Sequence, residues 1–322
     1  MSILVKTQNL VKRYGDLVAV DDISITIESG AIVGLVGRNG AGKTTLIRLL
    51  TGLAKPTSGS FQILPEEERL DTSVAAIVEK PSVYTNMTGL ENLKAQSLLL
   101  GIPVDEGYLR STLQVVGLDP TSKKKAGDYS LGMRQRLAIA MTIVGKPKLL
   151  ILDEPTNGLD PQGIFEMREL FVKLNQQFGT TLLVSSHILT ELGKFATEFY
   201  FMEKGRIIKH ATAEEIASGA QKRLRVVVDN VGKAVAAFRA PTETSVDVLP
   251  DQQTEQTELQ PANKISVAVV DPHVIEVRGD IPATQVLLVL AQNGVTATNI
   301  VTIGDDLEHY YIDLLNGGAQ NA

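Results

Sequence analysis

The sequence has 322 residues, of which 43% are hydrophobic and 21% are charged, an ordinary balance for a globular protein that buries a sizeable core. It contains no cysteine, which excludes disulfides, thiolate zinc sites and cysteine nucleophiles. The sequence has no apolar run of roughly 18 residues or more and no basic leader followed by an apolar stretch. We therefore expect neither a membrane span nor a secretory signal.

The net charge of −6 is distributed unevenly along the chain. Residues 1–220 contain 24 Lys and Arg against 24 Asp and Glu, whereas residues 221–322 contain 7 against 13. Neither part has the basic excess that is typical of nucleic-acid binding, so we expect no nucleic-acid partner. The shift in composition predicts a large domain over residues 1–220 and a small accessory domain over 221–322.

The first third of the sequence predicts strands followed by helices. S-I-L-V-K-T and D-D-I-S-I-T-I-E alternate apolar and polar residues, as a half-buried antiparallel sheet does. Residues 31–36 form an almost wholly apolar strand that leads through a glycine-rich turn into a helix over residues 44–53. Residues 84–145 are richest in helical periodicity, so we expect a helical subdomain there.

The next segments predict a mostly parallel sheet. Residues 148–154 and 180–187 read as buried strands, and an amphipathic helix lies between them at 164–175. Buried strands that alternate with helices are typical of an α/β fold in which helices cover a parallel sheet. Residues 198–209 predict a hairpin that turns at Lys204 and Gly205 and closes this domain.

The last hundred residues predict a small α/β domain. Strand patterns occur at 223–229, 265–270 and 298–303, and helix patterns at 234–238, 283–292 and 307–315. Residues 250–263 are polar and predict an exposed loop. The segment has no recognisable catalytic set, and His273 fits a loop residue better than a metal ligand. We expect this domain to stabilise a dimer or to bind a regulatory partner.

The first segment that indicates a chemical function is G-R-N-G-A-G-K-T at residues 37–44. It matches the phosphate-loop pattern and lies between a predicted strand and a predicted helix. The glycines let the backbone curl, so that successive N–H groups point at one anion. Lys43 would add a charge near the outer phosphates, and the Thr44 hydroxyl can bind Mg²⁺. The predicted nucleotide contacts of this loop are Asn39, Gly40, Gly42, Lys43, Thr44 and Thr45.

Two acids end the buried strand L-L-I-L-D-E at residues 149–154. We expect Asp153 beside the phosphate loop as a second Mg²⁺ ligand, and Glu154 where it can orient or deprotonate the attacking water. Adjacent acids at a strand end are otherwise solvated caps, but the phosphate loop in the same chain favours the catalytic interpretation. These residues predict an ATPase that uses ATP and Mg²⁺.

A further motif, Y-S-L-G-M-R-Q-R at residues 129–136, resembles the signature sequence L-S-G-G-Q of ATP-binding-cassette (ABC) ATPases. Ser130 and Gly132 keep its Ser-x-Gly core, whereas Leu131 replaces the first glycine. The motif lies between the phosphate loop and the acidic strand, as it does in that family. The resemblance covers roughly residues 3–218 and implies an ABC-type nucleotide-binding domain.

The resemblance implies roles for four more residues. Asp160, in P-T-N-G-L-D, resembles the D-loop residue that reaches toward a partner subunit. His187, which ends a strand, resembles the switch histidine that touches the γ-phosphate. Tyr14 resembles the aromatic residue that stacks on adenine, with Val20 packing nearby, although a tyrosine on the surface of a sheet would give the same pattern.

ABC ATPases hold ATP between two subunits, and the phosphate loop of one faces the signature residues of the other. The resemblance therefore implies a homodimer or heterodimer of ATPase subunits. The single phosphate loop and the lack of room for a coiled-coil insertion disfavour ABC ATPases that act on ribosomes or DNA. We expect an ATPase subunit that works in the cytoplasm, at the inner face of the cell membrane, with a separate transmembrane permease.

The direction and cargo of transport are suggested by several short segments. M-T-G-L-E-N-L, S-L-G-M and L-E-H-Y-Y-I-D-L-L resemble the exporter branch of the family. Within it, they resemble subunits for bacitracin resistance or lantibiotic immunity. The alternatives are an exporter of a drug, polysaccharide, lipid or sodium, or a non-transport ABC ATPase.

Glu79 follows the apolar run at residues 75–78, where the family normally has a glutamine that binds Mg²⁺ and contacts the membrane subunit. A carboxylate accepts hydrogen bonds but cannot donate one. We therefore expect Glu79 to bind Mg²⁺ while altering the coupling to the membrane subunit. The alternative is a solvated loop acid.

Overall fold

The computed structural model describes residues 2–63, 73–79, 81–219, 223–239, 265–279 and 281–303, and also Leu307, Tyr310, Tyr311 and Leu314. The chain divides into two compact units, Met1–Ala213 and Glu214–Ala322. Composition predicted a domain boundary at residue 220, whereas this division falls after Ala213. The loop expected at 250–263 and most of the helix expected at 307–315 lie outside the described residues.

A four-stranded antiparallel sheet opens the first unit. Strand β1 (Ile3–Tyr14) pairs with β2 (Leu17–Ile23), β3 (Thr26–Glu28) and β5 (Ser58–Ile63). The alternation in the first thirty residues predicted this sheet except for β5, whose S-G-S opening lacks an apolar pattern. The sheet places Tyr14 at its end and covers one side of the core.

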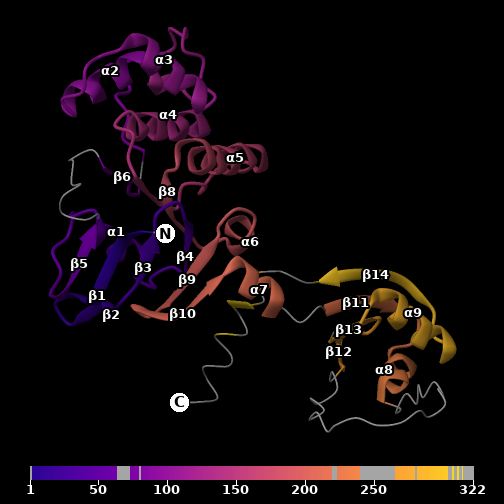
Figure 1. The fold of residues 1–322 in the computed structure, drawn as a ribbon. Helices are drawn as coiled ribbons and strands as arrows, with labels where there is room; N and C mark the ends of the chain where they lie inside the picture. Colours follow the sequence, from indigo (N-terminus) through magenta and orange to yellow (C-terminus); the bar gives the residue numbers. More distant parts are fainter. Residues whose placement is uncertain are drawn as a thin grey trace, which may run out of the picture. The chain divides into compact units, whose positions relative to one another are not determined.

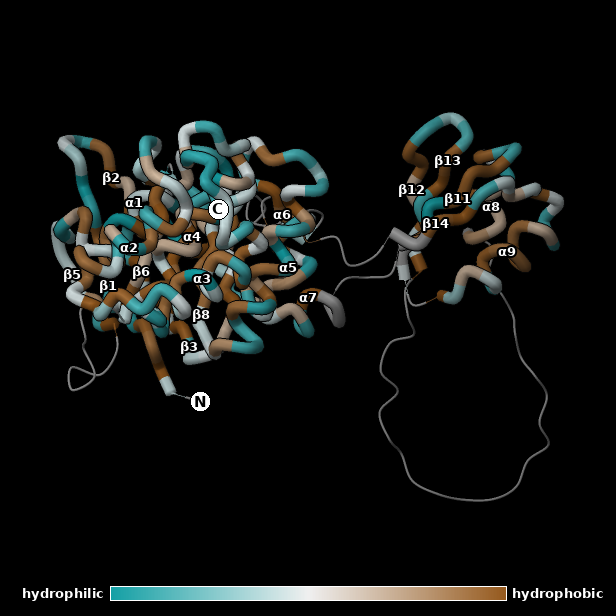
Figure 2. The backbone as a smooth tube through the Cα atoms, turned by 90° about the horizontal axis from the view of Figure 1, so that it is seen from above, coloured by the Kyte–Doolittle hydropathy of each residue, from teal (hydrophilic) through white to brown (hydrophobic). Residues whose placement is uncertain are grey.

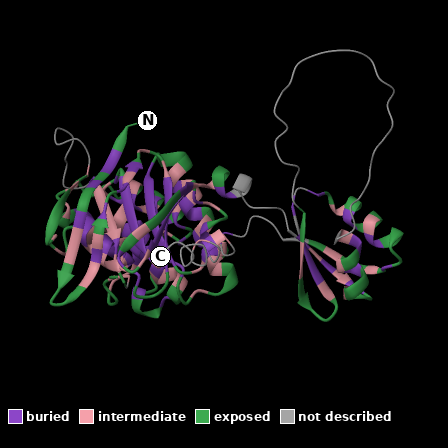
Figure 3. Cartoon of the chain, turned by 90° about the horizontal axis from the view of Figure 1, so that it is seen from below, coloured by how far each residue is buried: buried purple, intermediate pink, exposed green. Residues whose placement is uncertain are grey.

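A six-stranded sheet carries the predicted chemistry. It is made of β4 (Ile32–Val36), β6 (Val74–Ile77), β7 (Leu149–Asp153), β8 (Thr181–Ser186), β9 (Glu198–Glu203) and β10 (Arg206–Thr212). Their spatial order is β10-β9-β4-β8-β7-β6, with parallel pairing from β9 to β6 and an antiparallel β10. Every residue of β4, β7 and β8 is buried, and Figure 3 shows buried strands at the centre of this unit. The sequences of β4 and β7 are accordingly almost wholly apolar, whereas β8 begins with a threonine and ends with two serines. Parallel pairing brings the carboxyl ends of these strands to one edge.

Helix α1 (Lys43–Leu50) lies between the two sheets. Four of its apolar residues, Leu46, Ile47, Leu49 and Leu50, are buried in a core shared with both sheets. On the six-stranded sheet, α5 (Pro161–Phe178) packs against β8. The short helix α6 (Leu189–Leu192) follows β8 in the chain, and α7 (Ala213–Gly219) follows β10 at the boundary between the two units. Of the helices in the described residues, none has the length and apolarity needed to cross a bilayer.

The expected helical subdomain consists of α2 (Gly89–Leu99), α3 (Glu106–Val115) and α4 (Leu131–Ile143), which pack on one another (Figure 1). A capping box begins α2: the Thr88 hydroxyl accepts from the Glu91 N–H, and the Glu91 carboxylate accepts from the Thr88 N–H. Helix α4 also contacts β6, so the subdomain rests on the edge of the parallel sheet.

The second unit has a sheet with strand order β12-β13-β11-β14, antiparallel throughout. Its elements are β11 (Arg223–Val228), α8 (Val231–Arg239), β12 (Ser266–Asp271), β13 (Val274–Arg278), α9 (Ala283–Gln292) and β14 (Ala297–Ile303). Hydrophobic stretches in its helices and strands alternate with hydrophilic turns (Figure 2). The sequence did not predict β13, because Glu276 interrupts its apolar pattern, although that carboxylate is buried. His273 is exposed between β12 and β13, as expected of a loop residue.

Replacing Gly42 with alanine is expected to lower the unfolding free energy of the first unit by about 2–4 kcal/mol. The new Cβ would lie 2.3 Å from the Ala19 carbonyl oxygen, and the φ of Gly42 is 107°. Gly52, just beyond the other end of α1, has φ 74° but no atom within 4 Å, so Gly52→Ala should cost about 1–2 kcal/mol. Urea denaturation followed by circular dichroism measures both, since the chain lacks tryptophan. Equal losses would contradict this packing.

Candidate functional site

The phosphate loop occupies the turn between β4 and α1, at the carboxyl edge of the parallel sheet. Gly40 and Gly42 have φ of 82° and 107°, which only glycine adopts at little cost. Asn39 and Gly40 are exposed at the crown of the loop, whereas Thr45 is half-buried on α1. The curled backbone and the amino end of α1 are thus placed as the motif predicts for binding an anion.

Lys43 lies inside this loop, and its side chain is only 6% exposed. Its ammonium donates to the Gly37 carbonyl at 2.7 Å and lies 3.4 Å from Glu154 Oε1. A buried ammonium needs such partners, because a buried charge without them is costly. The positive charge is therefore held between the phosphate loop and the end of β7.

Asp153 ends β7 and is 4% exposed. Its Oδ2 accepts a 2.8 Å hydrogen bond from the Thr44 hydroxyl, and its Oδ1 accepts a 2.6 Å bond from the Ser185 hydroxyl. The structure thus brings together two of the three residues predicted to bind Mg²⁺, Thr44 and Asp153. Sequence reasoning missed Ser185, although two serines that end the apolar strand β8 could have indicated it.

Glu154 and His187 form a second group at the same edge. His187 Nδ1 lies 2.6 Å from Glu154 Oε2, and the Glu154 N–H donates to the Ser185 hydroxyl at 2.9 Å. Glu154 adopts a left-handed backbone with φ 49°, a conformation of roughly 1–3 kcal/mol strain that surrounding contacts must hold. The carboxylate contacts both Lys43 and His187, so the three predicted catalytic and phosphate-binding side chains meet.

The donor set suits a cation that is shared with a substrate. In the described part of the chain, no group of three or more His, Asp or Glu side chains gathers to hold a metal alone. Thr44 and Asp153 offer one hydroxyl and one carboxylate, which fits Mg²⁺ because that ion usually takes few protein ligands together with substrate phosphates and water.

Glu79 does not join Thr44 and Asp153 in the structure. It follows β6, beside the end of β7, with a left-handed φ of 67°. Its carboxylate forms an ion pair with Arg48 of α1. Sequence reasoning missed Arg48, because a residue on a helix gives no sign of a partner in a distant turn.

The signature and D-loop residues begin helices rather than touching the phosphate loop. Ser130 is the N-cap of α4 and accepts a hydrogen bond from the Met133 N–H at 3.2 Å. Asp160 is the N-cap of α5 and accepts from the Gly163 N–H at 2.8 Å. Gly132 lies in the first turn of α4, near Leu159. The contacts described for these residues are therefore local.

Tyr14 and Val20 differ in the surface that they offer to adenine. Tyr14 is 45% exposed, and the Lys12 ammonium lies 4.8 Å from its ring centroid. Val20 is fully buried within the core, at 0% exposure. Tyr14 presents a face on which a base could stack, whereas Val20 supports the sheet beneath it.

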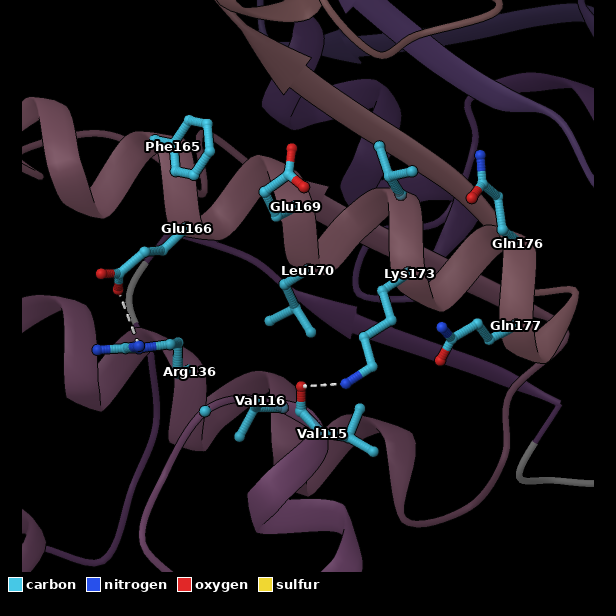
Figure 4. A pocket seen from close by; sticks show the side chains of 12 residues that line it. Val115, Val116, Arg136, Phe165, Glu166, Glu169, Leu170, Lys173, Gln176 and Gln177 are labelled. Carbon is cyan, nitrogen blue, oxygen red and sulfur yellow. Dashed lines mark hydrogen bonds and ion pairs between the residues drawn. The ribbon is translucent and has the colours of Figure 1, made fainter.

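A cavity away from these residues lies between the helical subdomain and α5, and Figure 4 shows its lining. Arg136 Nη1 bridges to Glu166 Oε2 at 2.9 Å, and Lys173 Nζ donates to the Val115 carbonyl at 3.4 Å. None of the predicted nucleotide or metal ligands lines it. Its polar bridges join α5 to the subdomain, so the cavity belongs to the junction between them.

Comparison with known proteins agrees with this geometry. The family model described as ABC transporter matches residues 20–157. The bacitracin transport ATP-binding protein BcrA of Bacillus licheniformis is 36% identical over 323 residues, covering 99% of each chain. The lantibiotic transport ATP-binding protein SrtF of Streptococcus pyogenes is 42% identical over 207 residues, covering 64% of this chain and 89% of SrtF.

A solved structure extends the comparison to the fold. The cbiO1 protein of Clostridium perfringens, part of the ABC transporter complex cbiONQ, superposes with a TM-score of 0.60 at 25% identity. The match covers 68% of this chain and 92% of cbiO1. Together with the phosphate loop and its acidic partners, these likenesses establish that the chain belongs to the ATP-binding subunits of ABC transporters and is an ATPase.

Proposed function

We propose that this chain is the ATP-hydrolysing subunit of an exporter that protects its cell against a peptide antibiotic. Its membrane-spanning part would be a separate permease polypeptide, and the chain would work at the inner face of the membrane. The observation that supports a peptide antibiotic as the transported cargo is the likeness to BcrA, which covers 99% of both chains and so includes the second unit.

The geometry supports hydrolysis by the residues around the end of β7. Glu154, held by its contacts with Lys43 and His187, would orient the attacking water and accept its proton. Lys43 would neutralise charge on the outer phosphates as the bond to the leaving group breaks. Mg²⁺ bound by Thr44 and Asp153 would supply further charge neutralisation, with Ser185 keeping the aspartate oriented.

The position of the helix caps supports a site that is completed by a second ATPase subunit, of the same or another sequence. Ser130 and Gly132 open α4, and the amino end of a helix favours an anion. The contacts described for them leave the phosphate loop of the same chain untouched. Ser130, Gly132 and Asp160 would then contact ATP bound to the partner, so that ATP holds the dimer closed.

Replacing Glu154 with glutamine is expected to lower ATP turnover in the assembled transporter by about 100-fold or more, because the amide cannot accept a proton. ATP affinity should be retained, since Lys43 and the loop are unchanged. Phosphate release and nucleotide titration measure the two effects. Glu169→Gln, on an exposed part of α5, is the control and should leave both unchanged. Normal turnover in Glu154→Gln would remove Glu154 from the role of base.

Replacing Lys43 with alanine is expected to weaken nucleotide binding by about 10- to 100-fold, which corresponds to losing one hydrogen bond between charged groups. Titration of the purified chain with a fluorescent ATP analogue measures the affinity. Lys209→Ala, on exposed β10, is the matched control. Equal affinity of Lys43→Ala and the unaltered chain would overturn the phosphate-loop assignment.

Deleting the gene together with neighbouring permease genes is expected to raise susceptibility to bacitracin or to a lantibiotic. Growth inhibition by these peptides, by other drugs and by sodium measures the specificity. Restoring the genes with Glu154→Gln should fail to restore resistance, which ties the phenotype to hydrolysis. Unchanged susceptibility to every peptide antibiotic, with altered tolerance of another compound, would refute the proposed cargo and leave the ATPase assignment intact.

A further inference from the structure

An ion pair joins α1 to the turn that follows β6. Arg48 Nη2 contacts Glu79 Oε1, and the side chains are 40% and 56% exposed. Neither residue contacts the group formed by Lys43, Glu154 and His187 in the described contacts. The pair nevertheless lies on the helix that the phosphate loop begins, which raises the question of what it controls.

Arg48 lies one helical turn from Thr44, one of the predicted metal ligands. Arg48 follows Thr44 by four residues, so both lie on the same face of α1, about 6 Å apart along its axis. Thr44 contacts Asp153 at the end of β7, while Glu79 follows the neighbouring strand β6. The same face of α1 therefore makes two polar contacts one turn apart, from Thr44 to Asp153 and from Arg48 to Glu79.

Glu79 is held less firmly than Glu154, the acid at the same edge of the sheet that also has a left-handed backbone. Glu79 and Glu154 follow adjacent parallel strands, and both have a left-handed φ. Glu154 is fixed by the Ser185 hydroxyl, Lys43 and His187. The contact described for the Glu79 carboxylate is with Arg48, in an exposed pair of the kind that contributes little stability. A weakly held carboxylate whose partner lies one helical turn from Thr44 can exchange that partner for a cation.

We propose that Arg48 is a positioning residue for Glu79, which it holds away from the Mg²⁺ site until Mg²⁺ and nucleotide bind. Binding then draws the Glu79 carboxylate from Arg48 toward Thr44 and Asp153. The inference rests on the proposed nucleotide and Mg²⁺ site. Because Arg48 competes with the cation for one carboxylate, the free energy of the ion pair opposes the binding of Mg²⁺ with nucleotide. The partner of Glu79 would thus report whether the site is occupied.

A double-mutant cycle on the purified full chain tests this competition. The affinity for a fluorescent non-hydrolysable ATP analogue is measured in the unaltered chain, Arg48→Gln, Glu79→Gln and the double variant, with Mg²⁺ and with EDTA. Arg48→Gln should tighten binding with Mg²⁺ by about two- to fivefold, the range expected for an exposed ion pair. The tightening should vanish in EDTA and in the Glu79→Gln background.

Two further variants separate this coupling from a general effect of charge. Arg110→Gln removes an exposed Arg–Glu pair of α3, whose side chains are 39% and 48% exposed, and should leave the affinity unchanged. Arg48→Lys keeps the charge and should return the affinity toward that of the unaltered chain. Both results would show that the effect requires a cation at position 48.

Three outcomes would overturn the proposal. They are no change in Arg48→Gln with Mg²⁺, an equal change in the Glu79→Gln background, or an equal change in EDTA. With Lys43-dependent binding intact, any of them overturns the role of Arg48 alone. If the unaltered chain binds the analogue without any effect of Mg²⁺, both this role and the proposed metal site are refuted.

Discussion

The site depends on one buried carboxylate, that of Asp153. A carboxylate that is removed from water is costly unless each oxygen has a hydrogen-bond donor. Thr44 on α1 and Ser185 on β8 supply these donors at 2.8 and 2.6 Å. The interaction therefore fixes three elements at once, because α1, β7 and β8 must meet for the charge to be satisfied. The Ser185 hydroxyl also accepts from the Glu154 N–H, which orients the neighbouring acid.

At the same edge of the sheet, the Glu154 carboxylate lies close to the Lys43 ammonium and the His187 ring. Lys43 lies between the phosphate loop and Glu154, and His187 lies on the other side of that carboxylate. Bound phosphates would compete with Glu154 for the Lys43 ammonium, and this competition would leave the carboxylate to a water molecule. The charges that hold the edge together are thus the same ones that we propose take part in hydrolysis.

The elements with local signals could be predicted from the sequence. Continuous apolar runs predicted β4, β7 and β8, and the glycine spacing predicted the loop at residues 37–42. Lys204 and Gly205 predicted the hairpin of β9 and β10, and both have the positive φ that such a turn requires. In each case the residues that specify the structure are close together in the chain.

Contacts between distant residues could not be predicted in the same way. The partner of Glu79 lies 31 positions earlier, and the partner of Asp153 on β8 lies 32 positions later. Neither spacing gives a periodic signal, so the contacts that Arg48 and Ser185 make became known only with the fold. The expected Mg²⁺ contact of Glu79 stays a prediction, since its side chain is paired with Arg48.

The role of the Asp153 carboxylate is tested most directly by the effect of Mg²⁺ on the nucleotide affinity of Asp153→Asn. An amide keeps the size of the side chain but removes the charge that would bind the cation. Titration with an ATP analogue, with Mg²⁺ and with EDTA, should show that Mg²⁺ strengthens binding to the unaltered chain and not to Asp153→Asn. An equal strengthening by Mg²⁺ in both proteins would contradict the central role given to Asp153.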